Sequence, residues 1–227
     1  MFGWTGVFLN FDLTRSKVVA EPYDTNLAFN FIGGRGFAAK ILWDRLKPGI
    51  DPFSIENKLI FAAGPLTGLG LPNSGKLIVA AKSPLTGGYG DGNIGTLAAV
   101  QMRKAGYDAV IIEGKSEAPV ILNIKNKVAE FIDAKDLWGL NSFETEAQLK
   151  IFYERTAGIV CIGPAGENLV KFATIVSQEG RSGGRPGMGA VMGSKNLKAV
   201  VFEGYNKIPV AYPKSMKELS AAGYREI

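Results

Sequence analysis

The chain has no histidine and only one cysteine among its 227 residues. Without histidine it cannot contain a Ser-His-Asp triad, a Cys-His nucleophile pair or a histidine-ligated zinc site. A single cysteine also excludes an internal disulfide or a four-cysteine metal cluster, and this usage is typical of a reducing cytosol. Cys161 itself lies in an apolar run over residues 158–163, which favours a buried small hydrophobic residue. We therefore expect a cytoplasmic protein.

The sequence also lacks a targeting segment, a long apolar run and a basic run. Its first residues show no basic stretch followed by a long apolar core, so we expect no signal peptide. The longest uncharged window, residues 59–75, is interrupted by glycines and by Pro65 and Pro72, so we expect no membrane helix. The net charge is +5, but the basic residues are not interleaved with aromatic ones. This pattern argues against nucleic-acid binding and suits an anionic small ligand.

Glycine is the residue present in excess, with 29 of the 227 positions. The glycines gather in four clusters, at residues 33–36, 64–75, 87–95 and 180–193. Such clusters indicate either backbone that closely approaches an anion with its N–H groups, or tight turns in a strand-rich fold. The glycines alone leave both interpretations open.

Short apolar or alternating runs predict many strands and fewer helices. Strands are expected over residues 6–11, 17–20, 58–62, 76–80, 109–113, 120–124, 130–133, 158–162, 172–176 and 199–203. Helices are expected over residues 37–46, 96–104, 142–153, 186–192 and 215–227. The mixture predicts a strand-rich α+β fold.

Three pairs of segments suggest an internal duplication. Residues 7–11 resemble 120–124, residues 63–65 resemble 162–164, and residues 109–114 resemble 199–204, in the same order along the chain. We therefore predict pseudo-repeats over about 1–115 and 116–205. In such a fold the glycine segments that end near Gly95 and Gly189 occupy equivalent places and could face one ligand from opposite sides.

Residues 90–95 read Gly-Asp-Gly-Asn-Ile-Gly, the GxGxxG fingerprint of a dinucleotide-binding turn. A predicted helix and a strand ending in Glu113 follow, roughly 20 residues on, where a ribose-binding carboxylate would lie. However, a long segment containing Pro84 separates the upstream strand from Gly90, and regular strand–helix alternation is missing. We therefore predict a phosphate-approaching turn at a helix N-terminus and reject an NAD- or FAD-linked enzyme.

Several longer phrases resemble one family. Residues 62–68, 82–87, 105–109, 162–168 and 189–199 together resemble the N-terminal domain of the tungsten-containing aldehyde ferredoxin oxidoreductases. Residues 87–93, 177–181 and 184–189 look most like its formaldehyde-type branch. The resemblance extends from about Trp4 to Val210. It implies a duplicated domain of two β-sheets over residues 1–210, and residues 211–227 would begin a truncated helical domain.

The resemblance also implies a function. Family members oxidise aldehydes to carboxylic acids and pass electrons to ferredoxin through a [4Fe-4S] cluster. Their tungsten is held by the sulfurs of two pterins, without a protein ligand, and magnesium bridges the pterin phosphates. The cluster ligands and the groups near the metal lie in later domains or on a cluster-bearing partner chain. A homodimer is possible, and we expect this chain alone to be catalytically incomplete.

Six positions carry over as cofactor-binding residues by resemblance. Asn93 matches a magnesium ligand, Gly95 lies where backbone meets a pterin phosphate, and Lys76 replaces an arginine found between cluster and pterin. Lysine keeps the charge of that arginine but loses its bidentate fork. The second group consists of Arg181, Ser182 and Gly183. By resemblance, Arg181 would contact pterin and the backbone carbonyl of Ser182 would be a magnesium ligand. No residue matches a catalytic acid or base. The alternative is a non-catalytic module that binds pterin or another anion, or a split subunit.

Overall fold

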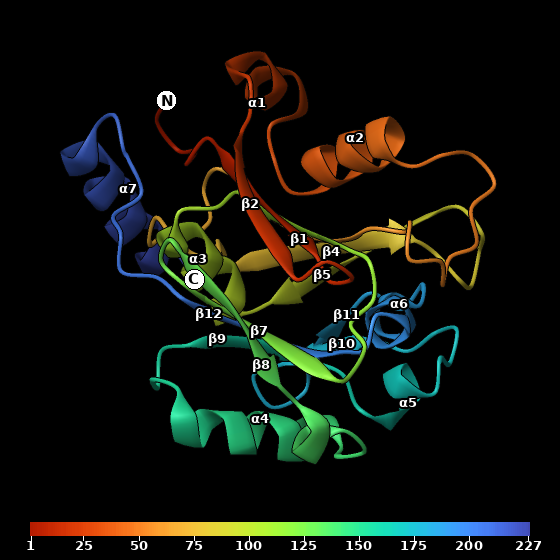
Figure 1. The fold of residues 1–227 in the computed structure, drawn as a ribbon. Coiled ribbons are helices and arrows are strands. Elements are labelled where there is room, and N and C mark those ends of the chain that lie inside the picture. Colours follow the sequence, from red (N-terminus) through yellow and green to blue (C-terminus); the bar gives the residue numbers. More distant parts are fainter.

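The computed structural model describes residues 1–227 and contains two mixed six-stranded β-sheets (Figure 1). The order across the first sheet is β2 (Lys17–Pro22), β1 (Val7–Asp12), β6 (Ala109–Glu113), β3 (Leu59–Ala63), β4 (Lys76–Lys82) and β5 (Tyr89–Gly95). The second sheet has β8 (Val128–Asp133), β7 (Val120–Lys125), β12 (Leu197–Glu203), β9 (Gly158–Cys161), β10 (Ile175–Ser177) and β11 (Arg181–Gly183). Continuous apolar runs form the central strands, because β3 and β9 are buried on both faces.

The two sheets share one topology. In the orders given above, each strand of the first sheet occupies the same position as the strand six numbers higher in the second sheet, so that β1 to β6 correspond to β7 to β12. The parallel pairs also correspond, since β1 lies parallel to β6 and β7 lies parallel to β12. The predicted fold class is therefore confirmed: the chain is a strand-rich, internally duplicated α+β structure.

Seven helices complete the fold. They are α1 (Thr25–Phe31), α2 (Arg35–Arg45), α3 (Leu97–Ala105), α4 (Ser142–Phe152), α5 (Pro164–Glu167), α6 (Met188–Ser194) and α7 (Pro213–Arg225). Local sequence explains their ends: the Thr96 side chain caps α3, Gly106 ends it in the left-handed conformation, and Asn141 with Glu144 forms a capping box on α4.

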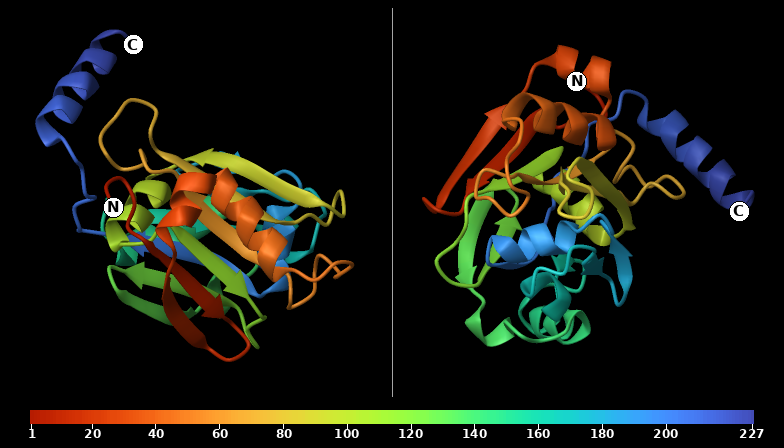
Figure 2. Two further views of the ribbon diagram at one scale, coloured as in Figure 1. Left: turned by 90° about the horizontal axis from the view of Figure 1, so that it is seen from above. Right: turned by 90° about the vertical axis from the view of Figure 1, so that its right-hand side faces the viewer.

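The helices and sheets form layers (Figure 1). The main core has 29 buried residues from the facing sides of both sheets and from α3 and α6. A second cluster of 12 residues lies between the first sheet and the helices α1 and α2, and a third of 7 residues includes Leu149 of α4 against the second sheet. The helix α7 has no buried residue and extends from the body (Figure 2). That it begins a further domain stays a prediction.

The prediction of a turn at residues 90–95 is wrong, because these residues form strand β5. Every residue of β5 pairs with β4 in antiparallel register. The strand β11, which lies in the fourth glycine cluster, was likewise missed and pairs with β10. Bulky β-branched and aromatic side chains normally mark a strand, but β5 has only Tyr89 and Ile94 of this kind among its seven residues, and β11 has none. The glycines serve a different purpose, which is a close approach of two backbones.

The approach occurs where the edge strand β5 meets the segment after β11. A Cβ atom at Gly92 would lie 2.1 Å from the amide nitrogen of Gly184, and one at Gly183 would lie 2.8 Å from the carbonyl oxygen of Asn93. Gly92 does not have a positive φ, so the need for glycine here is spatial. The two sheets thus come together at their edges only if side chains are absent.

A buried lysine joins the two halves at the other end of the first sheet. Lys195, just after α6, is 1% exposed. Its Nζ atom donates to the carbonyl oxygens of Asn57 at 2.6 Å and of Gly114 at 3.2 Å. Burial, and then the like charge of Lys58, lower the pKa of Lys195 to about 7.

We predict that Gly92→Ala destabilises the fold severely, by more than the ~1–3 kcal/mol typical of overpacking, because backbone atoms must move. Gly88→Ala is the matched control, since a Cβ atom there meets only Thr86 Oγ1 at 3.9 Å. Urea unfolding of both variants measures the difference. Equal unfolding midpoints would contradict the close approach.

We also predict that stability rises with pH between 7 and 9. The folded chain releases the Lys195 proton near pH 7, whereas the unfolded chain keeps it up to about 10.5, so raising the pH favours the folded state. The gain over this window is about 2 kcal/mol in the free energy of unfolding. Urea unfolding at several pH values should show it, and Lys195→Met should flatten the curve. A steep curve in that variant would refute the assignment to Lys195.

Candidate functional site

Strand register places three of the predicted site residues on one face of the first sheet. Lys76, at the start of β4, lies opposite Gly95, and Ile78 lies opposite Asn93 on β5. Residues directly opposite each other share a face, and alternate residues of one strand do too. Lys76, Asn93 and Gly95 therefore lie on the outer face, the one on which α2 packs, at the β5 edge of the sheet.

The second group reaches the same place from the second sheet. Arg181, on β11, donates from Nη1 to the carbonyl oxygen of Gly95 at 3.2 Å. Gly183 packs against the backbone of Asn93, and Ser182 lies between Arg181 and Gly183 in the same exposed edge strand. The structure thus brings together residues that are about 90 positions apart in the sequence.

Two cations without a carboxylate partner converge at this site. A Cβ atom at Gly95 would lie 3.3 Å from Arg181 Nη1 and 3.4 Å from Lys76 Nζ, so both cations border the same glycine. Neither side chain has a carboxylate within ion-pair distance, although twelve ion pairs occur in the chain. Two exposed cations beside bare backbone can bind an anion such as a phosphate.

Sequence reasoning missed a third cation beside the site. Arg35, the first residue of α2, forms a bidentate pair with Asp91 of β5, with distances of 2.5 and 2.9 Å. Tyr89 also donates to Asp91, at 2.9 Å. The hydrogen bonds from Arg35 to Asp91 raise the pKa of Arg35 further, so it stays charged. The only signal in the sequence was the position of Arg35 inside the first glycine cluster.

Two cavities flank the edge strands. One of about 460 Å³ is lined by Gly34, Arg35 and Lys76, with apolar walls that include Ile78. The other, of about 470 Å³, is lined by Leu97 at the start of α3, by Arg181 and by other charged residues of both signs, among them Glu146 and Glu179. Space for a ligand larger than one phosphate is therefore available on both sides of the cationic centre.

The residues present suit a ligand that brings its own metal-binding atoms. The chain has no group of three or more His, Cys, Asp or Glu side chains that could hold a metal ion. The oxygens at this edge come from the exposed Asn93 amide and from backbone carbonyls, which are hard ligands of the kind magnesium prefers. Cys161 offers no thiolate, because burial raises its pKa to about 12.

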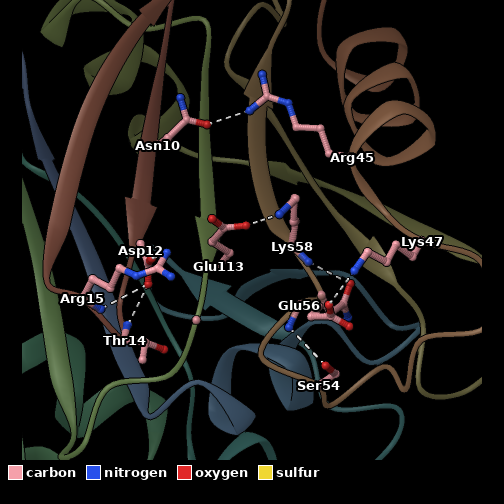
Figure 3. A network of polar contacts seen from close by, with 12 residues as sticks. Asn10, Asp12, Thr14, Arg15, Arg45, Lys47, Ser54, Glu56, Lys58 and Glu113 are labelled. Carbon is pink, nitrogen blue, oxygen red and sulfur yellow. Dashed lines mark hydrogen bonds and ion pairs between the residues drawn. The ribbon is translucent and has the colours of Figure 1, made fainter.

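A second polar network lies at the far end of the first sheet (Figure 3). Lys58 pairs with Glu113, Arg15 contacts Asp12 at 3.0 Å, and Arg45 donates to Asn10 at 2.8 Å. Arg45 also pairs with Glu21 at 3.0 Å. These residues line a cavity of about 420 Å³, but its arginines and Lys58 already have carboxylate partners. Glu113 lies three strands from β5, which agrees with the rejection of a ribose-binding role.

None of the helices is long and apolar enough to cross a lipid bilayer.

Comparison with known proteins identifies the family. Residues 8–204 match the family described as aldehyde ferredoxin oxidoreductase, N-terminal domain. The chain is 46% identical over 212 residues to the tungsten-containing aldehyde ferredoxin oxidoreductase of Pyrococcus furiosus, which covers 93% of this chain and 35% of that protein. It is 36% identical over 244 residues to a protein of the same organism named aliphatic sulfonate oxidoreductase, WOR-like subunit. That alignment covers 100% of this chain and 39% of that protein.

A solved structure agrees with these matches. The active site complex BamBC of benzoyl coenzyme A reductase, in complex with 1,5-dienoyl-CoA, has a chain that aligns with a TM-score of 0.92 and 40% identity. The alignment covers 97% of this chain and 34% of that one. The chain thus spans about a third of the length of the relatives it matches. The narrower resemblance to the formaldehyde-type branch stays a prediction. With its duplicated sheets and these matches, the chain belongs to the aldehyde ferredoxin oxidoreductase family.

Proposed function

We propose that this chain is the cofactor-binding N-terminal part of a tungsten-dependent oxidoreductase that converts an aldehyde to a carboxylate. One observation carries the proposal: Lys76 and Arg181, unpaired with any carboxylate, both border Gly95 where the edge strands of the two half-domains meet. The family is one of tungsten-containing enzymes, and a phosphorylated pterin cofactor needs such an anion-binding edge.

In this proposal each residue has a binding role. Lys76 and Arg181 hold the phosphates by charge, and the exposed Asn93 amide supplies an oxygen to magnesium. Gly95 lets the cofactor approach the backbone, while Ser182 contributes its carbonyl and Gly183 keeps β11 close to β5. The bound tungsten–pterin group would supply the redox chemistry. The chain's own residues bind it, orient it and balance its negative charge.

The rest of the reaction requires groups that this chain lacks. Aldehyde plus water gives carboxylic acid, two protons and two electrons, so proton acceptors and an electron path are needed. The exposed residues at the edge include no histidine, and no carboxylate there is free of a partner. We propose that the remaining two thirds of the polypeptide, or a separate chain, supplies these groups, the [4Fe-4S] cluster and the surface for ferredoxin.

A second candidate is a subunit that binds cofactor within a larger assembly and pairs with a separate cluster-bearing chain. One relative is named a subunit, and the solved neighbour belongs to a complex. This candidate uses the same cationic edge. It differs only in where the electron-transfer groups reside.

We predict that tungsten and pterin copurify with the protein isolated from its host together with the remaining domains or partner chain. That preparation should reduce a viologen dye when an aldehyde is added, whereas the 227-residue chain alone should not. Elemental analysis and dye absorbance provide the two measurements. Aldehyde-dependent reduction by the chain alone would refute catalytic incompleteness, and absence of tungsten from the intact preparation would refute the cofactor assignment.

We predict that the chain binds inorganic pyrophosphate at the cationic edge, measured by isothermal titration calorimetry. Lys76→Met and Arg181→Gln should each weaken binding about fivefold, because each removes one charge-assisted contact. Rising salt should weaken binding by the wild-type chain. The matched control is Arg15→Gln, an exposed arginine at the far end of the sheet, which should have no effect. Equal losses in all three variants would indicate a diffuse charge effect and contradict a site.

A further inference from the structure

Three polar side chains form a compact arrangement on the outer face of β5. Asp91 accepts both fork donors of Arg35, at 2.5 and 2.9 Å, and also the hydroxyl of Tyr89 at 2.9 Å. Asp91 and Asn93 are alternate residues of one strand and so share a face. The arrangement is therefore next to the cationic edge, although Arg35 comes from a different element.

The packing of the start of α2 against β4 sets the position of Arg35, the first residue of that helix. A Cβ atom at Gly34, the residue before the helix, would lie 3.3 Å from Cγ1 of Ile78. Ile78 is the cross-strand partner of Asn93, so the start of α2 lies over the strand next to the site. Arg35 and Lys76 also line the same cavity of about 460 Å³, and no carboxylate is among its lining residues.

The exposure of the pair is uneven. The Asp91 side chain is 14% exposed, whereas that of Arg35 is 57% exposed. The carboxylate is therefore the more buried partner and holds the Nε and Nη2 side of the guanidinium, so Nη1 remains available to a ligand. An unrestrained arginine loses much rotamer freedom when it binds, and a bidentate partner removes that cost in advance.

We propose that Asp91 is a positioning residue that holds Arg35 as a third cation of the anion site formed by Lys76 and Arg181. The ligand class is a molecule with two or more phosphate groups. This inference rests on the proposed function of the edge and adds two residues to it. Tyr89 supports the arrangement by donating a hydrogen bond to the same carboxylate.

The sign of one substitution tests the proposal. Asp91→Asn adds one positive charge to the edge, so a purely electrostatic role predicts tighter binding of anions. A positioning role predicts weaker binding, because Arg35 loses its fixed orientation. With inorganic pyrophosphate as the probe, we expect Asp91→Asn and Arg35→Gln each to weaken binding about fivefold. The double variant should lose no more than either single one, because both remove the same contact.

Further variants separate positioning from folding. Asp91→Glu keeps a carboxylate and should recover most of the affinity. Asp12→Asn is the matched control, since it changes the partner of Arg15, another arginine paired at 3.0 Å, at the far end of the sheet. It should leave pyrophosphate binding unchanged. Urea unfolding midpoints of all variants should stay close to that of the wild-type chain, which shows that the loss is not one of folding.

The outcomes are distinguishable. If Asp91→Asn binds pyrophosphate as tightly as the wild-type chain or more tightly, or if its effect adds to that of Arg35→Gln, the positioning role is overturned alone. If Lys76→Met and Arg181→Gln also leave binding unchanged, the anion site and the proposed function are overturned together. Weaker binding in Asp91→Asn, with an unchanged unfolding midpoint and recovery in Asp91→Glu, supports the proposal.

Discussion

The close approach of two glycine-containing backbones is the constraint on which the site depends. Gly92 of β5 and Gly184 after β11 leave no space between them for a Cβ atom. Since β5 is the edge strand of one sheet and β11 that of the other, this contact joins the two half-domains at their edges. A larger residue at Gly92 would separate the strands and move Arg181 away from Gly95.

Two cations without a carboxylate partner converge on one glycine at this edge. At the far end of the first sheet, Lys58, Arg15 and Arg45 each have a carboxylate partner (Figure 3). Such pairs contribute little stability when exposed, and they neutralise one another. At the edge, Lys76 and Arg181 have none, so their charge is available to a ligand. The position of unpaired charge, more than its amount, marks the site.

The internal duplication explains why the site has two halves. The strands β5 and β11 are the corresponding edge strands of the two sheets. The next helix after β5 is α3 and the next after β11 is α6, and both helices contribute to the main core. The two equivalent edges therefore meet face to face, as the ordered sequence matches suggested. The two edges are unequal: β5 has seven residues and pairs with an arginine from α2, whereas β11 has three residues.

The sequence by itself determined the elements that have their own side-chain signal. The strand over residues 109–113 is confirmed as predicted, and the apolar runs of β3 and β12 and the capped helix α4 were found to within a few residues. The strands are recognisable as short continuous apolar runs, because they are buried on both faces, and α4 is recognisable by the helical spacing of its apolar residues. The resemblance to a family supplied the six site residues, whose roles stay predictions.

Only the tertiary structure decided that the glycine segments form the edge strands β5 and β11 and which charged side chains lie beside them. Glycine has no side chain to show a period, so β5 was read as a turn and β11 as a loop. The pairing of Arg35 with Asp91 spans 56 positions, and that of Arg181 with Gly95 spans 86. Contacts across such distances depend on how sheets pack, and local sequence patterns do not encode them.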